Sequence, residues 1–380
     1  MKFLLIPDKF KNSITADGVN IAIAKGLKNC YNDAKLFSIL ASDGGDGFLD
    51  AINYHLSLEK VFIETVNPLG KKINAFFLYD GIKNVAYIEL AKASGVELLE
   101  TEELDVRNAS TLGTGYQIKE AIQLGAKKII IGLGGSATND AGIGIAYALG
   151  YRFKDSSGNE LYPSGKNLAL IREIALEPIK QQLKRDLDRW KNTKTKRADA
   201  GRLGGLAKAT NAKQKGATNE VIELLDLGLK KFSKIVEKFI GTDISEMEGT
   251  GAAGGSAFSL KAFFNAEFIR GVDFLFELAK IPEILNNNTI DYIITGEGKI
   301  DHQTLNGKLI KGILDIGKKK SIPVLAVCGI SELSNEELKT EGFADVLQIH
   351  ESNMSISYSM NNASKLIESK VYDYFKKNSK

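Results

Sequence analysis

The chain has 380 residues, a length that predicts two domains or one domain with a large insertion. Hydrophobic residues make up 43% and charged residues 26%, a balance that excludes disordered and collagen-like chains. No apolar run approaches the roughly 18 residues that a membrane span needs. The two cysteines, Cys30 and Cys328, lie far apart, which favours a reducing, cytoplasmic setting. Because the chain has only three histidines, carboxylates, lysines and backbone amides must carry any chemistry.

The net charge of +3 is unevenly distributed along the chain. Residues 176–216 hold 12 lysines and arginines against 4 acids, a local charge of +8 that leaves −5 for the rest. A mildly acidic protein with one basic stretch is not a general nucleic-acid binder. We therefore expect neither a membrane nor a nucleic acid as partner, although this stretch alone keeps a nucleic-acid tether as an alternative.

Glycines follow short β-branched runs and precede helical patterns, an order typical of α/β proteins. The elements expected in the first part of the chain are strands at 2–7 and 34–40, helices at 13–27 and 48–56, and antiparallel strands at 61–66, 73–79 and 85–90. Those expected afterwards are a helix from 110–111 to about 124, a strand at 127–132, an Ala/Gly-rich helix through 149, and strands at 291–295, 324–328 and 345–349. The late strands complement the early ones, which predicts a first domain built from both chain ends around a central insertion.

A glycine-rich loop follows the strand expected at 127–132. It reads Gly134-Gly135-Ser136-Ala137-Thr138-Asn139-Asp140 and precedes a helix. Free amides and the positive dipole end at a helix start bind anions, so phosphate or carboxylate is expected here. The loop matches neither a P-loop nor a GxGxxG motif, and glycines that merely allow close helix packing are the alternative.

Acidic residues stand beside glycine at three further strand ends. Asp43 and Asp46 flank a Gly-Gly pair and can share a magnesium ion, although a solvated turn is the alternative. The other two groups are Asp8, Lys9 and Lys11 after the first strand, and Gly296, Glu297, Gly298, Lys299 and Asp301 in a glycine loop after the strand at 291–295. Ligands of open α/β sheets bind beyond the carboxyl ends of the strands, so this convergence favours a phosphoryl-transfer site.

The ordered set of motifs resembles the type I glycerate kinase family. The matching segments are 7–11, 42–47, 94–95, 111–115, 134–140, 214–217, 249–255, 295–301, 303–304 and 307–308. The resemblance covers residues 1 to about 172 and 214 to about 375. It implies phosphorylation of D-glycerate by ATP with Mg²⁺, usually at the 2-hydroxyl and less often at the 3-hydroxyl.

The same resemblance implies two different α/β domains. We expect a flavodoxin-like parallel-sheet domain from residues 1–62 and 286–380, and an inserted mixed-sheet domain at 63–285. The substrate would lie in the cleft between them, in a cytoplasmic monomer or homodimer.

Residue roles within these motifs are physical hypotheses. Catalysis is assigned to Asp8, Lys9, Lys11, Asp43, Asp46, Glu297 and Asp301, with Asp43 and Asp46 also as metal ligands. Phosphate or nucleotide binding is assigned to Gly113, Thr114, Gly134, Gly135, Ser136, Thr138, Asn139, Asp140, Gly296, Gly298 and Lys299.

One segment, at about 175–213, departs from the family pattern. The family resemblance implies a strand that ends in Asp-Val-x-Asn-Pro-Leu here, but the chain instead shows an apolar stripe at Ile179, Leu183, Leu187 and Trp190, followed by basic residues. This pattern predicts a basic amphipathic helix and a flexible tail in place of the strand. Loss of the strand would open a sheet edge, and loss of its Asp could remove a ligand contact. The alternative function is therefore a catalytically impaired, kinase-like protein that still binds its ligands.

Overall fold

The computed structural model describes residues 1–42, 44–45, 47–177, 212–302, 304 and 309–378, together with the backbone of 197–199. The chain forms two compact units, which we call the terminal unit and the inserted unit. The terminal unit comprises Met1–Asp43 and Gly271–Lys380, and the inserted unit is Gly44–Arg270. The domain boundaries expected near 62 and 285 stay a prediction.

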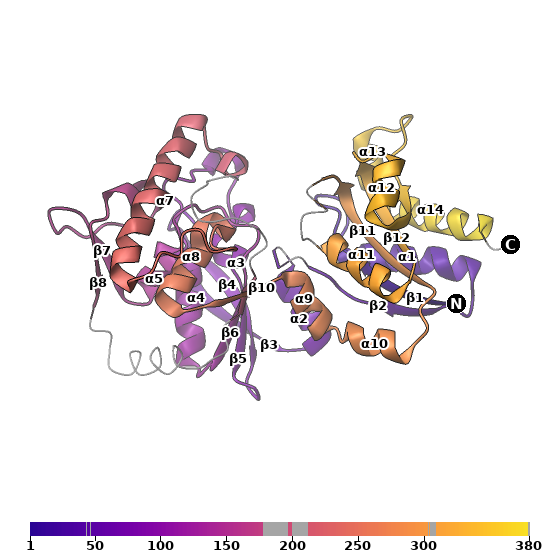
Figure 1. Cartoon of the computed structure of the whole chain (residues 1–380), viewed down its shortest axis with the longest axis horizontal. Helices are drawn as coiled ribbons and strands as arrows, with labels where there is room; N and C mark the ends of the chain where they lie inside the picture. The colour runs from indigo at the N-terminus through magenta and orange to yellow at the C-terminus, as the bar shows by residue number, and fades with distance from the viewer. Residues whose placement is uncertain are drawn as a thin grey trace. The chain divides into compact units, whose positions relative to one another are not determined.

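The terminal unit is built on a five-stranded parallel sheet in the order β13-β12-β11-β1-β2. The strands are β1 (Lys2–Pro7), β2 (Lys35–Ser38), β11 (Tyr292–Ile300), β12 (Val324–Ser331) and β13 (Phe343–Gln348). Numbered within this unit, the order is 2-1-3-4-5, which is the flavodoxin-like arrangement. In Figure 1 indigo β1 lies beside orange β11, and Phe3 to Pro7 pair with Tyr292 to Gly296. The predicted parallel sheet from both chain ends is confirmed.

Helices cover both faces of this sheet because its strands are apolar on both sides. The helices are α1 (Ala16–Cys30), α9 (Gly271–Leu278), α10 (Ile281–Asn287), α11 (Leu309–Lys320), α12 (Asn335–Glu341), α13 (Ile356–Asn361) and α14 (Ala363–Lys377). Phe3 and Leu5 pack with residues of α1 and α14, whereas Leu4 and Ile6 pack with residues of α9 and α11. Successive side chains of β1 therefore point to opposite faces of the sheet and pack into two separate apolar cores.

The inserted unit contains a mixed six-stranded sheet in the order β10-β9-β6-β5-β4-β3. Its strands are β3 (Glu59–Val66), β4 (Lys72–Asp80), β5 (Val85–Glu89), β6 (Lys128–Gly132), β9 (Arg197–Asp199) and β10 (Glu267–Ile269). The pairs β3–β4 and β4–β5 are antiparallel, as predicted, and the remaining pairs are parallel. A separate antiparallel pair joins β7 (Tyr151–Lys154) to β8 (Glu173–Leu176).

The helices of the inserted unit pack on this sheet around one large apolar core. They are α2 (Phe48–Leu56), α3 (Ala91–Ser94), α4 (Leu112–Gln123), α5 (Ile143–Ala148), α7 (Asn219–Ile240) and α8 (Ala252–Phe264). Short 3₁₀ turns are η1 (Val96–Leu98), η2 (Thr101–Glu103), η3 (Gly165–Leu170) and η4 (Ala212–Lys215). Ile88, Ile131 and Phe258 are among the fully or nearly fully buried members of the core.

The glycine loop expected after residue 295 is wrong, because β11 continues through Gly296-Glu297-Gly298-Lys299 to Ile300. The glycines serve close backbone approach instead of a turn. A Cβ on Gly296 would lie 2.3 Å from the Val327 carbonyl oxygen, and one on Gly329 would lie 2.4 Å from that of Gly298. Two neighbouring strands therefore run closer here than side chains allow.

Two further expectations differ from the structure. Helix α1 begins at Ala16 because the Thr15 side chain caps it by accepting from the Gly18 amide, not at Ser13. The sheet edge expected from the departing segment is wrong, because β9 lies between β6 and β10. The amphipathic stripe at 179–190 lies outside the described residues.

Within the part of the chain that the structure describes, no helix is both long and apolar enough to cross a membrane.

The contact of α1 with α14 gives a stability prediction. A Cβ on Gly26 would lie 2.6 Å from the Glu368 carbonyl oxygen and 3.0 Å from the Val371 Cβ. Because backbone cannot yield like the end of a side chain, Gly26→Ala should lower the free energy of unfolding by about 1–3 kcal/mol. Urea denaturation followed by circular dichroism measures the loss. Gly81→Ala is the control, since its Cβ would come no closer than 3.7 Å to Tyr79. Equal midpoints for the two variants would contradict this packing.

Candidate active site

The carboxyl end of β1 lies beside Gly296 in the second half of β11, within the terminal unit. The Asp8 amide donates to the Gly296 carbonyl oxygen at 2.8 Å, and the Asp8 carboxylate accepts from the Lys9 amide at 2.7 Å. A Cβ on Gly298 would lie 3.4 Å from the Phe10 Cα, so the segment after β1 runs along β11. The structure thus places Asp8 and Lys9, both half-buried, next to the Gly296–Gly298 stretch, and leaves Lys11 exposed.

Glu297 stands opposite Cys328 in the register of β11 and β12. Burial, with the negative charge of Glu297 as a second cause, raises the pKa of the Cys328 thiol to about 12. Cys328 is therefore a neutral core residue at neutral pH. The neighbouring Glu297 is only half-buried.

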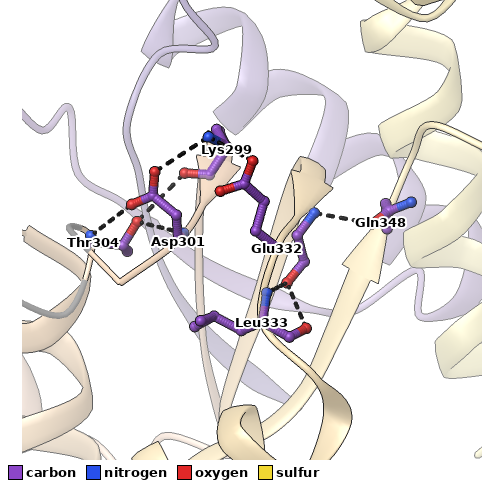
Figure 2. A network of polar contacts seen from close by, with 7 residues as sticks. Lys299, Asp301, Thr304, Glu332, Leu333 and Gln348 are labelled. Atoms are coloured by element: carbon purple, nitrogen blue, oxygen red, sulfur yellow. Dashed lines mark hydrogen bonds and ion pairs between the residues drawn. The ribbon is translucent and has the colours of Figure 1, made fainter.

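A polar network holds the end of β11 and the residues that follow it (Figure 2). The Lys299 ammonium lies 2.8 Å from Glu332 Oε1 and 3.5 Å from Asp301 Oδ2. The hydrogen bond with Glu332 is the main cause that raises the pKa of Lys299. Asp301 and Thr304 close a reciprocal turn, because the Thr304 amide donates to the Asp301 carboxylate at 3.2 Å and the Asp301 amide donates to Thr304 Oγ1 at 3.1 Å. Lys299 thus holds a positive charge at the strand end, half-exposed and paired with two acids.

The predicted magnesium ligands, Asp43 and Asp46, lie outside the described residues. Among the residues that are described, no three His, Cys, Asp or Glu side chains gather as a metal-binding group. The neighbours of the two aspartates are well fixed within the inserted unit. The Gly44 carbonyl oxygen accepts from the Gly134 amide at 3.2 Å, and a Cβ on Gly134 would lie 2.0 Å from the Gly45 Cα. The loop is therefore packed backbone to backbone against the end of β6.

Glu89, at the end of β5, holds the other side of this loop. Its carboxylate accepts from the amides of Gly47 at 3.3 Å and Leu49 at 3.0 Å, at the start of α2. Glu89 is buried, and the Lys92 ammonium lies 3.6 Å away. A carboxylate at a helix start satisfies amides that lack a partner within the helix. The sequence reasoning missed Glu89, although an acid directly after the apolar run 85–88 was the available signal.

Asp140 ends the glycine-rich loop and joins the starts of two helices. Its carboxylate accepts from the Thr111 amide at 2.8 Å, the Thr111 hydroxyl at 2.7 Å, the Gly142 amide at 3.1 Å and the Gly144 amide at 3.3 Å. Burial raises the pKa of Asp140, and these four donors act in the opposite direction. The anion at the start of α5 in this structure is therefore the protein's own carboxylate, and phosphate binding by this loop stays a prediction.

Gly113 and Thr114, predicted to contact phosphate, are buried in α4. A Cβ on Gly113 would lie 2.0 Å from the Val66 carbonyl oxygen, which explains the glycine by packing. The Thr114 hydroxyl shares a 2.7 Å hydrogen bond with that of Ser94. Their role as ligand contacts stays a prediction. In this structure both residues are buried and make contacts within the inserted unit.

The middle of the glycine-rich loop is held against the end of α3 and the start of η1. The Ala137 amide donates to the Ser94 carbonyl oxygen, and the Val96 amide donates to that of Gly135, both at 2.9 Å. Ser136, Thr138 and Asn139 are buried, and the ammonium of Lys215 reaches Ser136 and Thr138. The motif Gln214–Ala217 was recognised in the sequence, but no role was assigned to Lys215.

The chain is similar to known proteins in both sequence and fold. Residues 3–377 match the model described as the glycerate kinase family. A glycerate 2-kinase of Escherichia coli K12 is 34% identical over 87% of this chain and 85% of its own length. A glycerate kinase of Bacillus subtilis 168 is 36% identical over 88% and 87%. A crystal structure of a glycerate kinase 2 from Salmonella typhimurium LT2 covers 100% of this chain and 98% of its own, with a TM-score of 0.80 and 31% identity.

The internal role of Asp140 predicts a loss of stability. Asp140→Ala leaves four buried donors without this acceptor and should lower the free energy of unfolding by about 3 kcal/mol. Thermal and urea denaturation measure the change. Asp155 is the matched control, because its carboxylate also accepts from the amides of Ser157 and Asn159, but in an exposed turn. Asp155→Ala should change stability little. An Asp140→Ala protein as stable as the wild type would refute the cap.

Proposed function

Because this chain belongs to the glycerate kinase family, we propose that it transfers the γ-phosphate of ATP to the 2-hydroxyl of D-glycerate. The observation that carries the proposal is the match of nearly the whole chain to kinases of this name, in sequence and in fold. The 2-hydroxyl is favoured over the 3-hydroxyl because the relative from Escherichia coli is named a glycerate 2-kinase.

The strand ends of the terminal unit support this chemistry. Phosphoryl transfer needs cations beside the phosphates and a carboxylate that orients or deprotonates the accepting hydroxyl. Asp8 provides a carboxylate just after β1, Glu297 provides one on the neighbouring strand β11, and Lys9 and Lys11 follow Asp8 closely. Lys299 and Asp301 extend the same edge along β11. We assign these residues to the reacting groups, with one of the carboxylates as the base.

Asp43 and Asp46 are proposed to hold Mg²⁺. Carboxylate oxygens are the ligands that this ion takes, and kinases bind it through one or two of them together with substrate phosphates. The bound ion would neutralise charge on the phosphates during transfer. Gly44, Gly45 and Gly47 fix the backbone between and beside the two aspartates through the contacts with Gly134 and Glu89. The cytoplasmic location and a monomeric or homodimeric state are part of the same proposal.

The proposal is tested by turnover. Purified protein with ATP, Mg²⁺ and D-glycerate should release ADP in a coupled assay, and phosphorus NMR should identify 2-phosphoglycerate. A product with the phosphate on the 3-hydroxyl would correct the position of attack. A folded protein that binds ATP but releases no ADP would instead support the catalytically impaired alternative, which the departing segment at 175–213 motivates.

Glu89 gives a second test, since it holds the loop of the proposed magnesium ligands. Glu89→Gln keeps the size of the side chain but weakens its hold on the amides of Gly47 and Leu49. We expect the Mg²⁺ concentration for half-maximal rate to rise by about 10-fold, as for other changes behind metal ligands. Initial rates over a Mg²⁺ series measure this. Glu97→Gln, at an exposed acid, should behave as wild type, and an unchanged Mg²⁺ requirement in Glu89→Gln would argue against the role.

A further inference from the structure

Lys215 is a buried lysine whose position is fixed from both sides. It ends the turn η4, whose first residue, Ala212, is fully buried in a small cluster with Val106 and Leu225. Gly216 follows with a φ of +83°, and a Cβ there would lie 2.8 Å from the Leu104 Cβ. The turn therefore cannot shift without disturbing its packing, and it directs Lys215 inward, where 7% of the residue is exposed.

The Lys215 ammonium meets the glycine-rich loop. It donates to Ser136 Oγ at 3.0 Å and to the Thr138 carbonyl oxygen. Lysine is among the residues least often buried, because an ammonium loses its hydration there. The buried lysine thus brings an ammonium into contact with two oxygens of one loop.

The ammonium of Lys215 polarises the hydroxyl of Ser136, which is itself a hydrogen-bond donor. Its hydroxyl accepts from Lys215, so its O–H proton points away from the ammonium and is free to donate. Among the described residues no acceptor for this proton is present. A hydroxyl polarised by a neighbouring ammonium donates more strongly than one in water, and it favours an anionic acceptor.

Two more polar groups of the same loop point to an absent partner. Thr138 Oγ1 and Asn139 Nδ2 are buried and have no hydrogen-bond partner among the residues that the structure describes. Thr138 is 0% and Asn139 is 2% exposed. Buried polar atoms without partners are rare in folded proteins and mark a bound ligand or water.

The start of α8 closes the other side of the loop. A Cβ on Gly254 would lie 2.0 Å from the Thr138 carbonyl oxygen, and the Ala141 amide donates to the Gly254 carbonyl oxygen at 3.0 Å. Gly254 has a φ of +65° and its neighbour Ala253 one of +52°, a strained value for a residue with a side chain. The backbone of residues 253–255 is thus held in an unusual conformation directly against Thr138.

We propose that Lys215 and Ser136, with Thr138 and Asn139 beside them, form a subsite for an anionic oxygen group of a substrate. The proposal rests on the proposed function and adds the residue that supplies the charge in the inserted unit. The group is a carboxylate or a phosphate, so its source is either glycerate or the nucleotide. The next residue of the loop, Asp140, uses its carboxylate to cap two helices.

Lys215→Met removes the charge and keeps the length of the side chain. We expect the KM of one substrate to rise by about 10- to 100-fold, because one charge-assisted contact is lost. A rise in the KM of ATP assigns the subsite to a nucleotide phosphate, and a rise in that of glycerate assigns it to the carboxylate. Lys213→Met is the control, because Lys213 lies on the same turn but is exposed, and both of its KM values should stay within about twofold of wild type.

A purely structural role for Lys215 would lower stability and leave both KM values unchanged. A folded Lys215→Met protein with both KM values within about twofold of wild type would therefore overturn the subsite. If this variant does not fold, Ser136→Ala takes its place, with an expected rise of about 3- to 10-fold in the KM of one substrate and the same criterion for failure.

Calorimetry separates this inference from the proposed function. Titrations of wild type and Lys215→Met with ATP and with D-glycerate need no turnover. If the wild type catalyses no phosphorylation, the proposed function fails, but loss of binding of either compound in Lys215→Met still supports the subsite. Equal binding of both compounds by the two proteins would overturn it.

Discussion

Backbone segments in this protein approach each other more closely than side chains allow, and the arrangement of its loops depends on this. Gly134 lies against Gly45, Gly254 against Thr138, and Gly296 against Val327, each where a Cβ would come within 2.0–2.3 Å of backbone. A loop held by backbone contact on both sides cannot drift, because main-chain atoms have no rotamers to exchange. Contacts between main chains thus position the loops whose groups a phosphotransferase must hold in place. The polar side chains of the same loops are then available for ligands.

The placement of charge follows a second rule within the inserted unit. Helix starts attract anions, and here two of them are satisfied by buried carboxylates of the chain: Asp140 for α4 and α5, and Glu89 for α2. In the structure these two carboxylates accept from amides that a helix start could otherwise offer to an anion. Positive charge comes from Lys215, which reaches the loop from another part of the chain. In the proposed subsite, an ammonium and hydroxyls bind the anion more than a helix dipole does.

Sequence patterns predicted the elements well where periodicity and composition agree. The strand at Lys2–Pro7, the helix at Phe48–Leu56 and the antiparallel hairpins after it are confirmed. The patterns did not predict that the strand continues through Gly296–Ile300. A sequence alone does not distinguish a glycine that ends a strand from one that lets two strands approach closely. Glu89 and Lys215 could not be found as partners, because Glu89 acts on a loop 42 residues earlier and Lys215 on one 79 residues earlier.

The departing segment at 175–213 is less of a departure in the fold than in the sequence. Its residues Arg197–Asp199 pair with β6 on one side and β10 on the other, so the sheet continues through the segment. Because β9 is parallel to β6, its carboxyl end points to the edge of the sheet where the glycine-rich loop follows β6. The turn η4, whose last residue is Lys215, holds this lysine on the glycine-rich loop. The departing segment therefore keeps a strand in the sheet, and the lysine of the proposed subsite stands just after it.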